Sequence, residues 1–298
     1  MAQSMATDII YCAAGNRVMA DIAISAGMLY GAQLPGTVYH PIYFADQNWR
    51  SPRLGPYMAA LDRHRPRLAT VLDWTTPDRL ATVLDWADRA AEFAEVVIVI
   101  PKVPGGVHLL PRLIRGKEVR LGYSVPTKYG GTTVPLDEFS GWPVHLLGGS
   151  PQRQLEIARA IPVASADGNY VAKMAWLNKY WDGREFRDLS PAEMESVANR
   201  AHESFRRSCI NVVAAWQQLD KEINMIKYHA VKPRPQGKAH LINNWPHGRG
   251  TTLCGREYNQ EQVSEFQTEA TPDLVCGVCL NVLEANVRWG MGARAVAL

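Results

Sequence analysis

RLATVLDWTTPDRLATVLDWADRAAEFAEVVIVIPKV, residues 67–103, is the stretch of the chain that decides its fold class. It holds two β-rich runs, 68–74 and 96–103, on either side of a helical pattern at 77–94. Thr76 followed by Pro77 is a typical helix start, an N-cap residue with proline at the first helical position. A strand, a helix and a second strand in this order predict a β-α-β unit with parallel strands.

The octapeptide RLATVLDW occurs twice within this stretch, at 67–74 and again at 79–86. The first copy ends at a turn and is expected to be a strand, whereas the second lies inside the capped helical run. Asp73 would then lie at the carboxyl end of a strand, where barrel active sites are built, while Asp85 would lie in mid-helix. Of these two aspartates, only Asp73 is therefore a catalytic candidate.

Similar β-α units continue in both directions from this stretch. The expected strands are 9–14, 29–34, 68–74, 96–103, 119–124, 144–148 and 162–166, and the expected helices are 17–26, 56–63, 77–94, 152–160 and 169–180. Seven strands predict an α/β fold, either a TIM-like (β/α) barrel or a doubly wound sheet, and the barrel is favoured. The sequence does not reveal the eighth strand that a closed barrel needs.

The pattern changes after Gly183. A capping box, Ser190 with Glu193, is followed by apolar residues at helical spacing as far as Ile223, which predicts one long amphipathic helix packed on the barrel. A basic, proline-interrupted linker comes next. The expected domains are thus a catalytic barrel at 1–185, a helical extension at 186–230, and a linker with a small module at 231–298.

The small module carries a set of soft metal ligands. His240, Cys254, Cys276 and Cys279 follow the order His-x13-Cys-x21-Cys-x2-Cys, and a Cys-x2-Cys pair can turn two thiolates towards one ion. This spacing predicts a closed, structural Zn²⁺ site, with His247 as the rival fourth ligand. Buried thiols or a redox pair are the alternatives, but the strand-then-helix context of a redox motif is missing.

The carboxyl ends of the expected parallel strands bring polar residues together. Two acids, Asp73 and Asp167, converge there, and paired carboxylates can divide nucleophilic and proton-transfer roles in glycosyl chemistry. The alternative for each Asp is a plain helix cap or turn residue. The candidate substrate-binding residues at the same end are Lys102, His145, Gly148, Gly149, Ser150 and Ser165.

Composition excludes several classes of protein. The chain has 298 residues, 47% of them hydrophobic, and a formal net charge of +3, which is typical of a globular protein and permits a polyanionic partner without requiring one. Neither an apolar run of about 20 residues nor a signal-peptide pattern is present. We therefore expect a cytoplasmic protein without membrane contact.

Two short motifs resemble those of a known family. LLGGS at 146–150 and VASADGN at 163–169 resemble the tRNA-guanine transglycosylase superfamily, particularly its DNA-modifying branch from phages and actinobacteria. That resemblance implies a (β/α) barrel with a zinc site, which exchanges guanine for a 7-deazaguanine base through a covalent glycosyl-aspartate. It implies Asp167 as the nucleophile, Asp73 as the acid/base, and Gly148 with Gly149 as the segment that reads the base.

The predicted partners are therefore a nucleic acid, DNA rather than tRNA, and a free deazaguanine base, within a bacterial host cytoplasm if a phage encodes the chain. Two other functions stay open. One is a glycosidase that releases a base or sugar with the same two carboxylates. The other is a non-catalytic, zinc-containing nucleic-acid-binding protein.

Overall fold

The computed structural model describes residues 6–12, 16–127 and 130–224, together with the backbone of a few short strands beyond them. Two compact units make up the chain: one is Ala6–Leu219, and the other comprises Met1–Met5 and Asp220–Leu298. The first unit contains the barrel.

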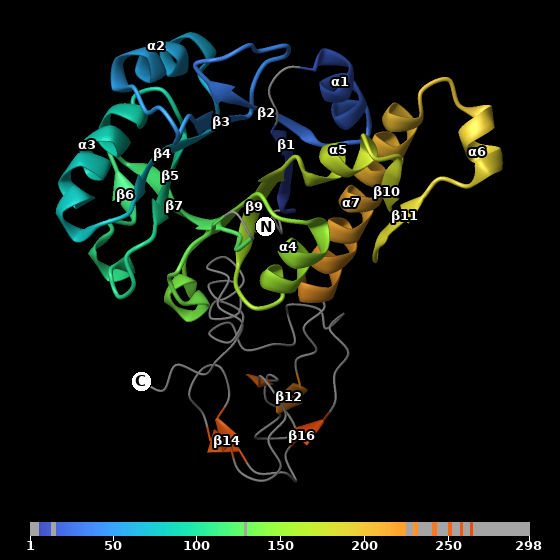
Figure 1. Cartoon of the computed structure of the whole chain (residues 1–298). Helices are drawn as coiled ribbons and strands as arrows, with labels where there is room; N and C mark the ends of the chain where they lie inside the picture. Colours follow the sequence, from blue (N-terminus) through green and yellow to red (C-terminus); the bar gives the residue numbers. More distant parts are fainter. Residues whose placement is uncertain are drawn as a thin grey trace. The chain divides into compact units, whose positions relative to one another are not determined.

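Eight parallel strands close into a barrel in the first unit (Figure 1). Each strand pairs with its neighbours in the order β1-β2-β3-β4-β5-β7-β8-β9, and β9 returns to β1. The expected TIM-like α/β barrel is confirmed at this level. The strands are β1 (Asp8–Cys12), β2 (Leu29–Leu34), β3 (Phe44–Gln47), β4 (Leu68–Trp74), β5 (Val96–Pro101), β7 (Lys117–Ser124), β8 (Val144–Leu147) and β9 (Val163–Gly168); the two-residue β6 (Leu113–Ile114) adds an antiparallel edge to β7.

The strand that the sequence did not reveal is β3. It has only four residues, Phe-Ala-Asp-Gln, without a β-branched side chain, and no helix separates it from β2. Both features remove the signals by which a strand is found in a sequence. All seven expected strands are present, with ends that differ by a few residues.

The repeated octapeptide adopts two structures, as predicted. Its first copy forms β4, which is buried on both faces because helices cover the barrel outside and side chains fill it inside. Its second copy lies mostly in α3 (Leu80–Ala90), which follows a single 3-10 turn at Pro77–Arg79 and buries Val83 and Trp86 while leaving Ala81 and Thr82 exposed. The surroundings, not the local sequence, select the conformation.

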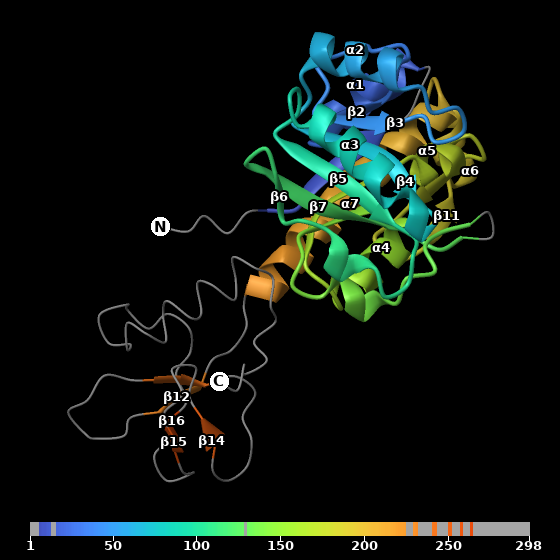
Figure 2. The ribbon, with the colours of Figure 1, turned by 90° about the vertical axis from the view of Figure 1, so that its left-hand side faces the viewer.

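Helices pack on the outside of the barrel (Figure 1), and Figure 2 shows α3 lying over β4 and β5. They are α1 (Arg17–Ser25), α2 (Leu54–His64), α3, α4 (Pro151–Ala158) and the short α5 (Tyr170–Ala175), which leads into the hairpin β10 (Lys179–Trp181) and β11 (Phe186–Asp188). The larger apolar core lies between strands and helices, and a smaller one fills the barrel with Ile10, Cys12, Phe44, Leu68, Val96, Ile98 and Ile100.

The prediction of a single long helix from Ser190 is wrong, because the segment forms two helices. The capping box is present, but α6 (Pro191–Ser196) stops where Val197 becomes extended, and Asn199 starts α7 (Arg200–Asn224) by accepting a hydrogen bond from the His202 amide at 3.0 Å. Helix α7 packs on the barrel as expected: the rings of Phe205 and Tyr11 of β1 are 5.1 Å apart.

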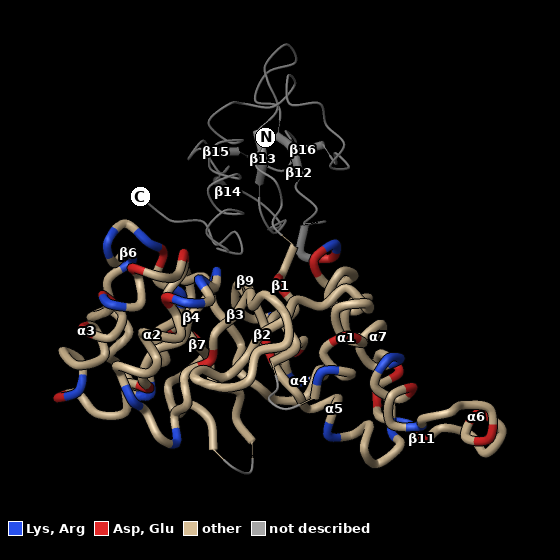
Figure 3. Tube along the Cα trace, turned by 90° about the horizontal axis from the view of Figure 1, so that it is seen from above, with Lys and Arg blue, Asp and Glu red and all other residues tan. Residues whose placement is uncertain are grey.

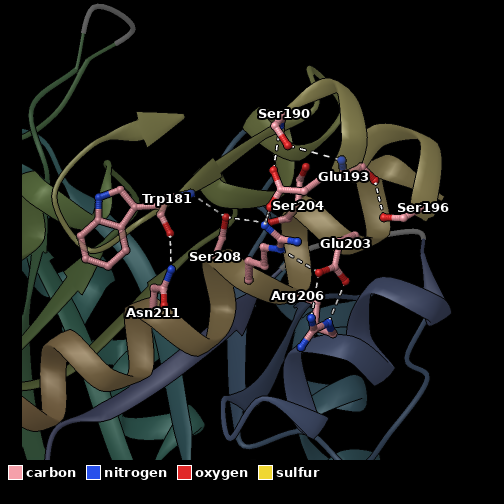
Figure 4. Close-up of polar contacts among 10 residues, drawn as sticks. Trp181, Ser190, Glu193, Ser196, Glu203, Ser204, Arg206, Ser208 and Asn211 are labelled. Carbon is pink, nitrogen blue, oxygen red and sulfur yellow. Dashed lines mark hydrogen bonds and ion pairs between the residues drawn. The ribbon is translucent and has the colours of Figure 1, made fainter. Parts of the chain in front are cut away.

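One ion pair joins α6 to α7, and two more lie beside it within α7 (Figure 4). Arg207 contacts Glu193 of α6 and, at 2.7 Å, Glu203 of its own helix, while Arg206 also binds Glu203 at 2.8 Å. These cations hold the pKa values of both glutamates at about 2. Because α6 has no buried residue, the Glu193–Arg207 pair and the hydrogen bond from Arg200 to the Met194 carbonyl oxygen at 3.1 Å are its main described attachments to α7.

Five short strands of the second unit are described by backbone alone: β12 (His229–Val231), β13 (His240–Ile242), β14 (Gly250–Thr251), β15 (Glu257–Tyr258) and β16 (Val263–Ser264). His240 lies in β13, but Cys254, Cys276, Cys279 and His247 fall outside the described residues, so the predicted zinc site stays a prediction. The domain boundaries expected at 185 and 230 likewise stay predictions. None of the described helices has the length and apolar character of a membrane span.

Candidate active site at the carboxyl end of the barrel

A β-bulge in β4 turns Asp73 towards the barrel interior. Thr70 pairs with Ile98 of β5 and Asp73 pairs with Ile100, so β4 contains one residue more than its partner between these positions. Since side chains alternate along a strand, the extra residue puts Asp73, instead of Leu72, on the same face as Thr70. There its Oδ2 lies 2.7 Å from Nζ of Lys102, which directly follows β5.

Asp167 reaches the same end of the barrel from β9. Its Oδ1 accepts a hydrogen bond from the backbone N–H of Gly148 at 3.3 Å, and its side chain is only 12% exposed. Gln154 of α4 donates to the carbonyl oxygens of Gly148 at 2.8 Å and Asp167 at 2.7 Å. The turn after β8 and the end of β9 are thus fixed to each other, and the carboxylate is held in one place.

A buried chain of polar side chains lies behind Asp167. Arg120 of β7 donates to Oγ of Ser165 at 2.8 Å, and this hydroxyl lies 2.7 Å from Nδ1 of His145. Nε2 of the same imidazole is 3.4 Å from Oδ1 of Asp167, an ion-pair distance without hydrogen-bond alignment. His145 and Ser165 are both fully buried.

The charge state of His145 follows from this setting. Burial, the largest cause, lowers the pKa of His145, while the carboxylate of Asp167 acts in the opposite direction. A neutral imidazole that accepts the Ser165 proton at Nδ1 carries its own proton on Nε2, which faces Asp167. His145, held by Ser165, therefore lies behind Asp167 with its Nε2 directed at the carboxyl group.

Asp46 is the site residue that the sequence analysis missed. It lies on β3, in register with Gln33 of β2, and Oγ1 of Thr70 is 3.2 Å from its Oδ1. Burial is the main cause that raises its pKa to about 7; the charges of Asp167 and, more weakly, Asp73 raise it further, against hydrogen bonds from Thr70 and Gln33 that lower it. The pKa of Asp46 thus depends on the charges of both predicted catalytic acids, Asp73 and Asp167.

Three carboxyl groups therefore gather at one end of the barrel, on β3, β4 and β9. The buried thiol of Cys12 on β1 lies near two of them, since burial and the charges of Asp167 and Asp46 raise its pKa well above the usual value. Within residues 6–12, 16–127 and 130–224, no group of three His, Cys, Asp or Glu side chains could hold a metal ion.

The turn Gly148-Gly149-Ser150 joins β8 to α4 with both glycines in the left-handed region, at φ +65° and +85°. Ser150 caps α4 by accepting a hydrogen bond from the Arg153 amide at 3.3 Å. Only Gly149 is also sterically restricted, because an added Cβ would lie 2.6 Å from a methyl group of Val125, whereas a Cβ at Gly148 would meet nothing within 4 Å.

We therefore expect Gly149→Ala to lower the free energy of unfolding by about 2–3 kcal/mol, since backbone strain and a steric clash add. Gly148→Ala, the matched control, should lower it by only about 1 kcal/mol through strain alone. Urea unfolding followed by tryptophan fluorescence measures both values. Equal effects of the two substitutions would contradict the close packing of Gly149 on Val125.

The fold and this cluster define a closed eight-stranded (β/α) barrel with acidic side chains at the carboxyl end of its strands. Residues 24–217, more than half of the chain, match the model of the family described as "Family of unknown function (DUF6610)", and the chain belongs to this family.

None of the curated proteins matches the sequence. Among solved structures, the X-ray crystal structure of the YdjI aldolase from Escherichia coli K12 is similar, with 8% sequence identity and a TM-score of 0.44. The alignment covers 74% of this chain and 91% of that chain. A likeness this distant carries no argument about chemistry.

Proposed function

We propose that the protein is an enzyme that exchanges guanine for a 7-deazaguanine base in a nucleic acid, through a covalent bond between Asp167 and the sugar. The observation that carries the proposal is the pair Asp167 and Asp46, two neighbouring carboxyl groups in different environments. Asp167 accepts a backbone N–H at 3.3 Å and lies 3.4 Å from Nε2 of His145, whereas burial and the charge of Asp167 raise the pKa of Asp46 to about 7. Paired carboxyl groups in different environments are typical of glycosyl chemistry.

The first half of the reaction uses both groups. An oxygen of the Asp167 carboxylate attacks C1′ of the target nucleotide, the bond between C1′ and the guanine nitrogen breaks, and the proton of the Asp46 carboxyl group goes to the departing base. In the second half, the Asp46 carboxylate takes a proton from the incoming base. The ring nitrogen of that base then attacks C1′, and the ester bond to Asp167 breaks.

The family resemblance assigns the acid/base role to Asp73 instead. Asp73 is already paired with Lys102 at 2.7 Å, whereas the pKa of Asp46 is raised to about 7, so we propose that Asp73 and Lys102 bind the substrate and that Asp46 transfers the proton. The variants Asp46→Asn and Asp73→Asn separate the two assignments, since only the acid/base residue should change the pH dependence of guanine release. Asp85→Asn, in the helical copy of the octapeptide, is a matched control for Asp73→Asn.

The nucleic acid, with DNA preferred over tRNA, is part of the proposal through the motifs at 146–150 and 163–169. Charge neither demands nor opposes a nucleic acid: Lys and Arg are interspersed with Asp and Glu over the barrel trace (Figure 3), and the formal net charge of the chain is +3. A target inside a duplex would have to leave the base stack, at a cost of a few kcal/mol.

A base-exchange assay tests the proposal. The protein is incubated with labelled guanine and with double-stranded DNA or tRNA, and the label in the polymer is compared between wild type and Asp167→Ala. Incorporation that disappears in the variant supports the transglycosylase, and the preferred polymer names the substrate. Release of guanine without incorporation would favour a glycosidase, and binding without either event would favour a non-catalytic nucleic-acid-binding protein.

We also propose that His240, Cys254, Cys276 and Cys279 hold one structural Zn²⁺ ion in the second unit. Four protein ligands leave no open position on the metal, so its contribution would be to the stability of the module.

The wild-type protein is accordingly expected to contain about one zinc ion per chain. Cys276→Ser and Cys279→Ser should lose it, because a hydroxyl is a poor zinc ligand, while Cys209→Ser, a buried cysteine of α7, should keep it. Metal analysis after dialysis gives the content, and His240→Ala against His247→Ala identifies the fourth ligand. A wild-type chain without zinc, or full occupancy in Cys276→Ser, would contradict the site.

A further inference from the structure

An exposed tryptophan lies beside the carboxyl cluster. Trp49 is 61% exposed, whereas Trp74, Trp181 and Trp216 are each at most 2% exposed. It lies three residues after Asp46, in the turn that leaves the carboxyl end of β3. An exposed indole at the mouth of a barrel offers a flat apolar surface to a ligand ring.

The turn that carries Trp49 is fixed by hydrogen bonds. The side chain of Gln47, only 3% exposed, donates to the carbonyl oxygen of Asn48 at 2.8 Å, and the Ser51 amide donates to the same oxygen at 3.1 Å. Oδ1 of Asn48 accepts from the Arg50 amide at 3.2 Å. The backbone that carries Trp49 is therefore set before a ligand arrives, which lowers the entropy lost on binding.

The charges around Trp49 fit an anion. The guanidinium of Arg50 lies 5.1 Å from the centre of the Trp49 ring, and Arg53 is exposed at the start of α2. Residues 47–57 contain no Asp or Glu, and neither arginine forms an ion pair within the described part of the chain. A ligand with both an aromatic ring and a phosphate satisfies the indole and the cations together.

We propose that Trp49, with Arg50 and Arg53, is a stacking platform for an unpaired base that neighbours the target nucleotide, with the arginines on its phosphates. This inference rests on the proposed function, because it takes the polynucleotide as the substrate of the carboxyl cluster. It adds that the enzyme recognises a strand whose bases next to the target are unstacked. A free nucleoside would reach the carboxyl groups without using the platform.

Binding and exchange are measured separately so that the two proposals can fail separately. The binding probe is a short, fluorescein-labelled, single-stranded DNA of mixed sequence that contains guanine, titrated by fluorescence anisotropy. Trp49→Ala should raise its Kd about 10-fold, within the range known for loss of one stacked base, and Trp49→Phe should largely restore it. Arg50→Ala should lower the salt dependence of binding by about one phosphate contact.

Trp176 provides the matched control, since it is 57% exposed but lies at the end of α5, against His202 of α7. Trp176→Ala should leave the Kd unchanged. In exchange assays, Trp49→Ala should raise KM for the oligonucleotide, with little change in kcat or in the reaction of free deoxyguanosine.

An unchanged Kd in Trp49→Ala, or an equal rise in Trp176→Ala, would overturn the platform while leaving the base exchange intact. Tight, Trp49-dependent binding without any exchange would support the platform and contradict the proposed reaction. The platform would also be overturned if the wild-type protein binds no oligonucleotide but forms a dimer that Trp49→Ala dissociates. That result would identify the surface as an interface between copies.

Discussion

Asp167→Asn is expected to reduce base exchange by roughly 10³-fold or more, because an amide oxygen is a far weaker nucleophile than a carboxylate. The fold should be unaffected, since the amide oxygen can still accept the hydrogen bond from the Gly148 N–H. Single-turnover release of guanine from a labelled oligonucleotide measures the effect directly, and circular dichroism checks the fold.

Asp85→Asn is the control for this experiment. Asp85 is an exposed residue of α3 that pairs with Arg89 at 3.2 Å and takes no part in the proposed reaction. The substitution should therefore leave the rate unchanged. Activity of Asp167→Asn close to that of the wild type would contradict the assignment of Asp167 as the nucleophile.

Asp46→Asn is expected to slow guanine release by about 10²–10⁴-fold, the usual contribution of a general acid. The wild-type rate should fall as the pH rises through about 7, because the Asp46 carboxyl group loses the proton that it donates. The slow residual rate of the variant should lack this limb. A pH profile of single-turnover release between pH 5 and 9 tests both statements; a limb that persists in Asp46→Asn and disappears in Asp73→Asn would return the role to Asp73.

The free energy of unfolding should also depend on the ionisation of Asp46. Since the pKa of Asp46 is raised to about 7 in the folded chain, the native state binds a proton more tightly than the unfolded chain does. The wild type should therefore lose stability relative to Asp46→Asn as the pH rises from about 4 to 7, by at most about 4 kcal/mol. Urea unfolding of the two proteins at pH 4.5 and 8 measures this difference.

Seven strands of the barrel were predictable because each is a β-rich run of at least four residues, most of them bounded by turn residues. The octapeptide shows that capping and neighbours add information that residue identity lacks: Pro77 after Thr76 was enough to assign the second copy to a helix. Strand β3 had no such signal, and Asp46 was lost with it. The break between α6 and α7 was missed because apolar spacing continues through Val197 to Ala201 across the interruption.

The sequence predicted which strand ends form the candidate site, but it did not predict which way the side chains on those strands point. Asp73 enters the barrel only because of the bulge between Thr70 and Asp73, which no sequence pattern announces. The contact of His145 with Ser165 joins two strands and could not be found from either alone. Arg120, a charged residue between the buried Val119 and Leu121 of β7, was the available signal that a polar group lies inside the barrel.

The most direct test of the account is a search for the covalent intermediate. The protein is mixed with a 5′-labelled, guanine-containing oligonucleotide without an incoming base, quenched in denaturant, and analysed on a denaturing gel and by peptide mass spectrometry. The account predicts a protein–oligonucleotide adduct on the peptide that contains Asp167, absent in Asp167→Asn and removed by adding guanine or a 7-deazaguanine. Release of guanine without any adduct, or an adduct on another residue, would contradict it.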